Sequence, residues 1–313
     1  MNENNIGHKS IEYKLISILG SDNVIKEADM SSYTTFRIGG IADYVVTPEN
    51  EEQLAKLLHL IKEENVDFVV IGNGSNILVS DNGFDGIVIQ LGDKFSSFVI
   101  KDKDESGVYV DVTAGMRLSR LGNELAASSI EGFEFATGIP GTIGGAVMMN
   151  AGAYGGEIKD IIKSARVIDF DGNVKELSRD ELELGYRTSI IAKKNYIVIS
   201  AVFDLKKGDR EKIKSNIKEL ALKRREKQPL EYPSAGSTFK RPEGYFAAKL
   251  IEDAGLKGLS VGGAQVSEKH AGFVINKKDA KAVDVIRLTD EIKEKVYDKF
   301  GVKLELEIKK IGF

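Results

Sequence analysis

The pattern of apolar and polar positions divides the chain into a β-rich first part and a more helical last part. Residues 49–64 place four apolar side chains on one helical face after an acidic first turn, which predicts a helix. A second helix is expected at 117–130. Short apolar runs bounded by Gly, Asn and Asp predict strands. These runs are 68–71, 77–79, 86–89, 108–112, 165–170, 175–177 and 196–205.

The pattern changes at about residue 209. A long charged helix is predicted up to Lys227, followed by a loop from Pro233 to Pro242. Helices are expected near 245–254 and 279–299, with a strand region at 261–275 between them. In 303–309, Leu304, Leu306 and Ile308 alternate with charged residues, which predicts a half-buried strand. The fold class expected is therefore α+β: a mixed N-terminal unit, a β-rich middle unit and a smaller α/β third unit.

Composition narrows the classes of function. At 313 residues, two or three packed units are expected. The chain has no cysteine, which excludes disulfides, thiolate metal sites and cysteine nucleophiles. No segment resembles a signal peptide or a membrane span, so we expect a cytoplasmic protein without a membrane partner. The net charge of −4 argues against nucleic-acid binding by the whole chain.

A first glycine-rich turn follows the predicted strand at 68–71. Gly72-Asn73-Gly74-Ser75-Asn76 begins like a dinucleotide-binding fingerprint, but Ile77 stands at the third glycine position and a strand pattern follows. A Rossmann site is therefore disfavoured. Backbone N–H groups in such a turn can still bind phosphate. Alternatively, this is only a tight turn between two strands.

A second stretch, 138–156, holds seven glycines in nineteen residues. Its other residues are small and apolar, which is unlike a disordered linker. Glycine is needed where backbone approaches a ligand closely, and Ile139, Ile143, Ala146 and Met149 could form a wall for a flat ring such as a flavin. The alternative is a close-packed structural loop.

Other catalytic signals are weak. There is no Walker sequence and no nucleophile-elbow serine, and His8, His59 and His270 are isolated, without metal-ligand spacing. If the protein is an enzyme, proton transfer would then depend on Ser, Glu, Lys, Tyr or Arg side chains.

Six segments in order resemble one known family. They are Thr34–Gly40, 72–81, 138–155, Gly185–Ser189, Ser234–Pro242 and Leu304–Lys309. Together they are similar to UDP-N-acetylenolpyruvoylglucosamine reductases, from about residue 31 to the C-terminus.

The resemblance implies a fold of the vanillyl-alcohol-oxidase type, with two FAD-binding subdomains, a substrate-binding domain and a C-terminal strand that returns to the active site. The expected boundaries are 1–92, 93–208, 209–300 and 301–313. Non-covalent FAD is implied, since the glycine-rich stretches contain neither His nor Cys. The residues implied for FAD are Arg37, Gly72, Asn73, Gly74, Ser75, Asn76, Gly138, Pro140, Gly141, Gly144, Gly145, Ala146, Asn150, Ala151 and Gly152.

The resemblance also implies the reaction: NADPH-dependent reduction of the enolpyruvyl ether of a UDP-sugar, a step toward peptidoglycan. Ser237 is the implied proton donor, and Arg187 and Glu307 assist the charged intermediate. These roles are sound chemistry, because a cation stabilises an enolate and a positioned hydroxyl can deliver a proton. Taken alone, the three would be a loop serine, a surface arginine and a solvent-facing glutamate.

Lys240, Gln265 and Tyr232 are the expected substrate-binding residues. Lys309 stands where the family commonly has Arg. Lysine keeps the positive charge but lacks the planar, forked guanidinium group of arginine. Some members carry an inserted loop with a substrate-covering tyrosine, whereas here 206–228 contains no tyrosine, so the chain resembles the shorter branch.

A monomer is expected. Two other hypotheses stay open: an oxidase of the same fold, and a nucleotide-binding module without redox activity.

Overall fold

The computed structural model describes residues 3–313, with side chains from residue 11 onward. The chain divides into two compact units, each made of several segments and each described by itself. Unit 1 comprises residues up to Lys26, Tyr44–Asn73 and Gly86–Leu222. Unit 2 comprises Glu27–Asp43, Gly74–Asp85 and Lys223–Phe313. The predicted boundaries at 92, 208 and 300 stay a prediction.

The α-helices are α1 (Glu3–Leu19), α2 (Glu51–Glu64), α3 (Leu118–Ala127), α4 (Ile143–Met148), α5 (Ile158–Ile161), α6 (Ile190–Lys194), α7 (Arg210–Lys227), α8 (Ala247–Asp253) and α9 (Ala282–Phe300). The strands are β1 (Val24–Asp29), β2 (Ile41–Val46), β3 (Phe68–Ile71), β4 (Ile77–Val79), β5 (Phe84–Gln90), β6 (Phe98–Asp102), β7 (Gly107–Thr113), β8 (Ile130–Glu131), β9 (Gly152–Ala153), β10 (Gly156–Glu157), β11 (Ile162–Ile168), β12 (Val174–Ser178), β13 (Ile197–Lys207), β14 (Ser260–Val261), β15 (Ala264–Val266), β16 (Val274–Asn276) and β17 (Lys309–Ile311). The mixed helices and sheets confirm the α+β class. The elements α1 and β1 were not predicted from the pattern.

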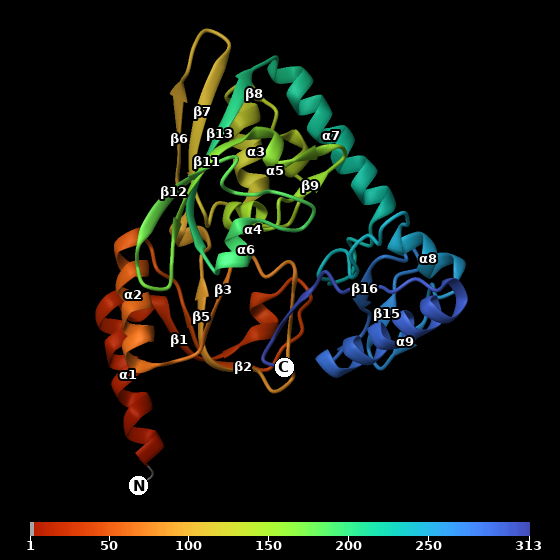
Figure 1. Ribbon diagram of the computed structural model, residues 1–313, viewed down its shortest axis with the longest axis horizontal. Coiled ribbons are helices and arrows are strands. Elements are labelled where there is room, and N and C mark those ends of the chain that lie inside the picture. Colours follow the sequence, from red (N-terminus) through yellow and green to blue (C-terminus); the bar gives the residue numbers. More distant parts are fainter. Residues whose placement is uncertain (1–2) are drawn as a thin grey trace. The chain divides into compact units, whose positions relative to one another are not determined.

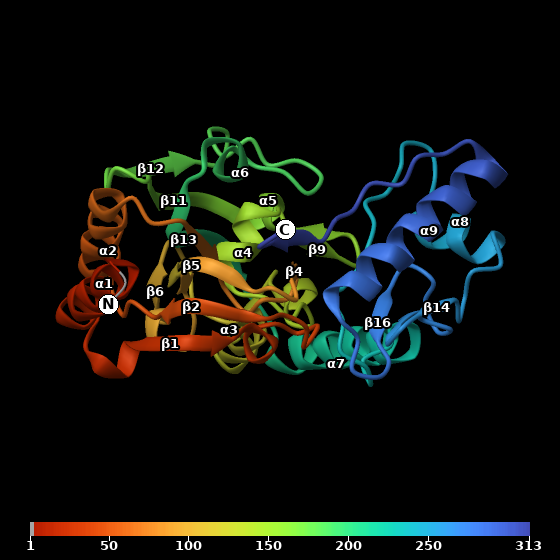
Figure 2. The ribbon, with the colours of Figure 1, turned by 90° about the horizontal axis from the view of Figure 1, so that it is seen from below.

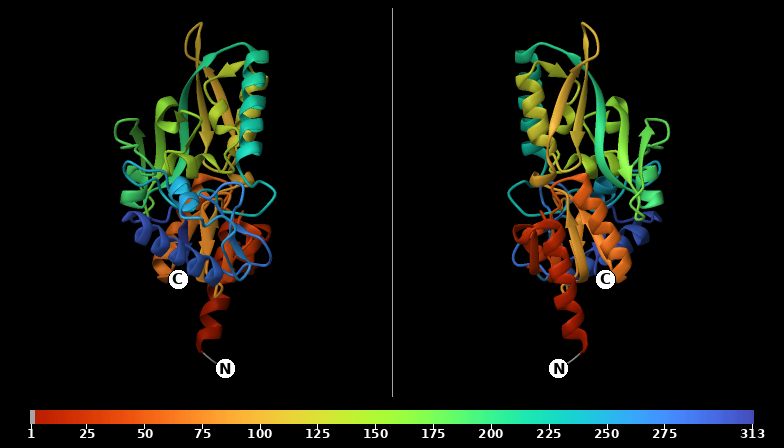
Figure 3. Two further views of the ribbon diagram at one scale, coloured as in Figure 1. Left: turned by 90° about the vertical axis from the view of Figure 1, so that its right-hand side faces the viewer. Right: turned by 90° about the vertical axis from the view of Figure 1, so that its left-hand side faces the viewer.

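An antiparallel sheet of order β12-β11-β13-β7-β6 is the framework of unit 1, with β8 also paired to β13 (Figure 1). The expected hairpin over 165–177 is its β11–β12 edge. Alternate residues of β7 and most of β13 are buried, as expected for β-branched strands that pack on a core. The amphipathic helix α2 packs beside α1 in the same unit (Figure 3). The core of unit 1 includes Phe133 and Phe203, whose rings meet edge to face at 5.5 Å.

Unit 2 has a separate core built around α8, α9 and the three-stranded sheet β14-β15-β16. In Figure 2, α9 lies along this sheet, which it contacts at β14 and β15. Leu288, Ile292 and Val296 form the buried stripe of α9, the one-face pattern of an amphipathic helix. The short strand β17 pairs in parallel with β4, which brings the C-terminus beside residues 77–79.

Candidate functional site

In unit 1, the beginning of the first glycine-rich turn is packed against the second glycine-rich stretch. A Cβ at Gly72 would lie 2.1 Å from the Thr142 Oγ1 atom, so only glycine fits. The Asn73 side chain donates a hydrogen bond to the Pro140 carbonyl oxygen at 3.1 Å. The turn is followed by strand β4 rather than a helix, which confirms the rejection of a Rossmann loop.

The second stretch is more ordered than the expected loop, because it contains the short helix α4 and the two-stranded hairpin β9–β10. The expectation that Ile143 and Ala146 wall a ligand is wrong: their side chains are 0% and 3% exposed and belong to the core. Gly145, by contrast, is exposed, and a Cβ there would meet no atom of the chain closer than 3.8 Å. Neither crowding within the chain nor an unusual backbone angle explains this glycine. A glycine of this kind leaves room for a ligand that approaches the backbone, so the stretch fits a flat cofactor such as FAD.

Arg187 lies in unit 1 in a tight turn that is attached to the end of α4. The turn is closed by hydrogen bonds from Gly185 N to Thr188 O (3.1 Å) and back from Thr188 N to Gly185 O (3.3 Å). Arg187 itself has φ of +53°, an unfavourable conformation for a long side chain. Fully buried Ser189 donates from Oγ to the Met148 carbonyl at 2.6 Å. The local structure therefore fixes this arginine in an uncommon backbone conformation, as is frequent at functional sites.

In unit 2, Ser237 and Glu307 lie on neighbouring extended segments. Glu307 N donates to Thr238 O, and Lys240 N donates to Glu305 O, both at 2.9 Å. Phe239 and Leu306 form an antiparallel bridge between these bonds. The loop that carries Ser237 is thus joined by backbone hydrogen bonds to the segment that carries Glu307.

The predicted strand at 303–309 is wrong: within this segment Leu306 forms an isolated bridge, and strand β17 begins only at Lys309. The expected alternation of burial is also broken at Glu307. Leu304 and Ile308 are buried as predicted, but Glu307 is also buried, with only 7% of its surface exposed. The side chain of Glu305 is 73% exposed and pairs with Lys240 at 3.0 Å. Burying a carboxylate costs free energy unless charged or hydrogen-bonding partners compensate for its lost hydration. This departure distinguishes Glu307 from Glu305, which the pattern alone did not.

Unit 2 also gathers the remaining residues of the first glycine-rich turn. Gly74 has φ of +61°, and its carbonyl accepts from Thr35 N at 3.2 Å. Asn76 donates from its side chain to the Glu307 carbonyl at 3.3 Å. Arg37 is exposed, with φ of +54°, and its carbonyl accepts from Asn276. The predicted residues Arg37, Gly74, Asn76 and Glu307 therefore belong to one connected region.

The three predicted substrate-binding side chains have partners within unit 2. Lys240 pairs with Glu305, as described above. Tyr232 accepts a hydrogen bond from Lys277 Nζ at 2.7 Å, and the ammonium also lies 4.2 Å from the ring centre. Gln265 donates to Ser260 Oγ at 3.0 Å. Substrate contact by these residues stays a prediction.

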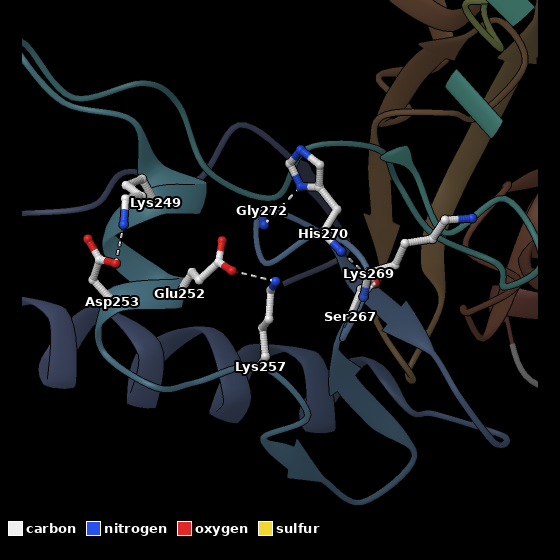
Figure 4. A network of polar contacts seen from close by, with 8 residues as sticks. All are labelled: Lys249, Glu252, Asp253, Lys257, Ser267, Lys269, His270 and Gly272. Carbon is white, nitrogen blue, oxygen red and sulfur yellow. Dashed lines mark hydrogen bonds and ion pairs between the residues drawn. The ribbon is translucent and has the colours of Figure 1, made fainter. Parts of the chain in front are cut away.

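A polar network around His270 was not singled out from the sequence, because a lone histidine carries little signal (Figure 4). Gly272 N donates to His270 Nδ1 at 3.1 Å, and Ser267 Oγ accepts from the backbone N–H of His270. Lys257 pairs with Glu252 at 2.6 Å. Burial, aided by the positive charge of Lys257, lowers the pKa of His270 below its ordinary value of 6.5, so the ring is neutral at pH 7.

The predicted site residues are thus divided between the two units. Unit 1 holds Arg187, Gly72, Asn73 and the predicted residues of 138–152. Unit 2 holds Ser237, Glu307, Arg37, Gly74–Asn76 and the three predicted substrate-binding residues.

Two family models match this chain. The model described as FAD binding domain matches residues 42–178, and the model described as UDP-N-acetylenolpyruvoylglucosamine reductase, C-terminal domain, matches residues 228–311.

Relatives match over almost the whole length. The UDP-N-acetylenolpyruvoylglucosamine reductase of Clostridioides difficile (strain 630) is 50% identical over 307 residues, covering 98% of this chain and 99% of its own. That of Lachnoclostridium phytofermentans is 53% identical over 299 residues, covering 96% of each chain.

Solved structures agree with these relatives. The reductase of the same name from Thermus caldophilus superimposes with a TM-score of 0.77 at 34% identity, covering 92% of this chain and 98% of that one. p-Cresol methylhydroxylase, at 12% identity and a TM-score of 0.60, shares the fold alone, which confirms the expected type of FAD-binding fold. From these matches, the chain belongs to the family of UDP-N-acetylenolpyruvoylglucosamine reductases.

Proposed function

We propose that this protein reduces the enolpyruvyl ether of UDP-N-acetylglucosamine to the lactyl ether of UDP-N-acetylmuramate, using non-covalent FAD and NADPH, for peptidoglycan synthesis. The observation that carries the proposal is the buried carboxylate of Glu307 on the segment hydrogen-bonded to the Ser237 loop. Burying a carboxylate costs free energy that a purely structural position in this segment would not require. The full-length similarity to reductases of that name supports the same reaction.

FAD would be held by the two glycine-rich segments. Residues 72–76 present backbone N–H groups suited to the pyrophosphate, and Gly145 leaves its backbone accessible to a flat ring. When bound, FAD supplies the hydride acceptor for NADPH and the hydride donor for the substrate double bond. FAD would be bound non-covalently, because neither stretch contains a His or Cys side chain that could attach it.

The chain's own residues would manage the charge and the proton. Reduction adds a hydride to the terminal carbon of the double bond and a proton to the carbon that bears the carboxylate. The Arg187 guanidinium would stabilise the negative charge that develops on that carboxylate. Ser237 would deliver the proton from its hydroxyl, with Glu307 assisting.

The proposal also covers the nicotinamide donor, the oligomeric state and the location of the enzyme. The nicotinamide donor is NADPH, the enzyme acts as a monomer, and it acts in the cytoplasm. Among the described residues, no helix combines the length and apolar character that crossing a membrane requires.

Turnover with the complete substrate pair tests the function. NADPH oxidation should require the enolpyruvyl UDP-sugar, and mass spectrometry of the product should show two added hydrogens. In D₂O with ordinary NADPH, the carbon beside the carboxylate should carry deuterium, because its hydrogen comes from a solvent-exchangeable proton donor. NADPH oxidation that consumes oxygen and ignores the sugar would instead identify an oxidase. A protein that takes up no FAD would be a nucleotide-binding module.

A further inference from the structure

Asn150 was expected to bind the cofactor, but its side chain is occupied within the chain. The residue is 2% exposed and has φ of +43°, a conformation that asparagine tolerates better than most residues. Its amide nitrogen donates to Glu157 Oε2 at 2.8 Å and to the Gly185 carbonyl at 3.1 Å. Its amide oxygen accepts from Lys159 N at 2.9 Å. Both donor hydrogens and the acceptor are thus used, which leaves no amide hydrogen for a ligand.

These hydrogen bonds connect the glycine-rich stretch to the Arg187 turn. Gly185 is the first residue of that turn, two positions before the arginine, so the amide of Asn150 holds the turn at its base. Ser189 holds the other end through the Met148 carbonyl. Met148 is the last residue of α4, and Asn150 follows it by two positions. The backbone of the turn is therefore fixed on both sides of Arg187.

Glu157 is the second element of this arrangement. It lies at the end of the hairpin β9–β10, opposite Gly152, where a Cβ would come within 2.7 Å of the Glu157 side chain. The hairpin turns through Tyr154 and Gly155, both with positive φ, which suits a tight two-residue turn. The absence of a side chain at Gly152 thus lets the carboxylate lie next to Asn150.

The Glu157 carboxylate is held in the charged form. The hydrogen bond from Lys159 at 2.9 Å, the one from Asn150 and the nearby guanidinium of Arg187 all lower its pKa. The Glu157 Oε2 atom accepts the hydrogen bond from Asn150 Nδ2, so the carboxylate fixes the orientation of the amide that holds the turn.

We propose that Asn150 and Glu157 are positioning residues for Arg187: the Asn150 amide fixes the turn through the Gly185 carbonyl, and the Glu157 carboxylate fixes the Asn150 amide in the orientation that makes this bond. The proposal rests on the role proposed above for Arg187. It assigns to Asn150 a function distinct from cofactor binding. It also explains why a glycine-rich segment proposed for FAD contains one buried, fully bonded amide.

The test is a double-mutant cycle on the rate at which the reduced enzyme transfers hydride to the enolpyruvyl UDP-sugar. Glu157→Gln should slow this step about 10- to 100-fold, the range expected when a catalytic group is misplaced by about 1 Å. In an Arg187→Ala background, the same substitution should have almost no further effect, since residues acting as one unit are not additive. Multiplicative effects would overturn the proposal. If Arg187→Ala alone leaves the rate unchanged, the role proposed for Arg187 fails as well.

Three further measurements separate positioning from damage to the fold. Flavin reduction by NADPH and the dissociation constant of FAD should be unchanged in Glu157→Gln, while calorimetry should show weaker binding of UDP-N-acetylmuramate. Glu183→Gln is the matched control, because Glu183 lies two residues before Gly185 but pairs with Lys193, exposed on the surface; it should leave all of these values unchanged. Asn150→Gly keeps the positive-φ backbone without strain and removes only the side chain. This variant should also slow hydride transfer to the sugar selectively. Loss of FAD affinity together with an equal slowing of both half-reactions would instead show that Asn150 serves the cofactor or the fold.

Discussion

The Arg187 turn of unit 1 and the Ser237–Glu307 segments of unit 2 are held in place in different ways. Side-chain hydrogen bonds from Asn150 and Ser189 hold the turn, whose arginine has a positive φ. Backbone hydrogen bonds between 238–240 and 305–307 hold the other pair. Hydrogen bonds between backbone groups remain when most neighbouring side chains are substituted. Hydrogen bonds from a side chain are lost when that side chain is removed. Substitutions around Arg187 should therefore affect activity at a distance, and those around Ser237 should matter mainly at the functional atoms.

The largest effect is expected from Ser237→Ala. Loss of a positioned proton donor should slow protonation of the intermediate by about 10²- to 10⁴-fold, while flavin reduction by NADPH stays normal. Single-turnover spectroscopy of the two half-reactions measures both. Ser32→Ala, at an exposed serine of the same unit, should change neither rate. Normal turnover by Ser237→Ala would remove the proton-donor assignment.

A smaller effect is expected from Arg187→Lys. Lysine keeps the positive charge but meets a carboxylate at one point rather than two, so the rate of sugar reduction should fall by roughly 10- to 100-fold, the range for a misplaced group. The measurement is kcat at saturating NADPH and sugar. An unchanged rate would show that charge alone matters at this position.

Ser189→Ala tests the side-chain attachment without touching a functional atom. The hydroxyl is fully buried, donates to Met148 O and accepts from Ala192 N at the start of α6. Its loss should cost about 1–2 kcal/mol of unfolding free energy and slow the Arg187-dependent step. Ser178→Ala is the control, since that hydroxyl bonds Glu181 on the surface and its removal should cost under about 0.5 kcal/mol. Equal destabilisation by both variants would contradict this description of the turn.

The smallest effect on stability is expected at the exposed pair of Lys240 and Glu305. Removing it should change the unfolding free energy by less than about 1 kcal/mol. Lys240→Met should raise the KM for the sugar if the ammonium binds substrate. Glu305→Gln removes the same ion pair but keeps the cation, so it should leave the KM unchanged or lower it. A KM increase in both variants would mean that the pair acts structurally.

Much of this arrangement could be predicted from the sequence, and the failures have physical causes. Helices such as α2 and α9 were predicted because each has one apolar face. The α1 helix was not predicted, although Ile11, Leu15 and Leu19, spaced four residues apart, form its buried stripe. The side chains of Ile143 and Ala146 do not form the expected wall, because a glycine-rich run conceals the short helix α4, which turns both side chains into the core. Contact of Ala146 with the cofactor stays a prediction.

The site shows the same limits. Ser237 and Glu307 were named from the family resemblance, but only the fold reveals that the alternating pattern is broken at Glu307. No local signal in the sequence connects Asn150 with Gly185 or Glu157, because the first of these hydrogen bonds spans 35 residues. Contacts that depend on a tertiary fold are not encoded in short-range periodicity.

The most direct test of the proposed reaction is the visible absorption spectrum of the purified protein under anaerobic conditions, recorded before and after NADPH and then after the enolpyruvyl UDP-sugar. We predict flavin bands that bleach with NADPH and return when the sugar is added, since both half-reactions use the same cofactor. Bands that bleach but return only with oxygen, or a protein without flavin bands that takes up no FAD, would contradict the account.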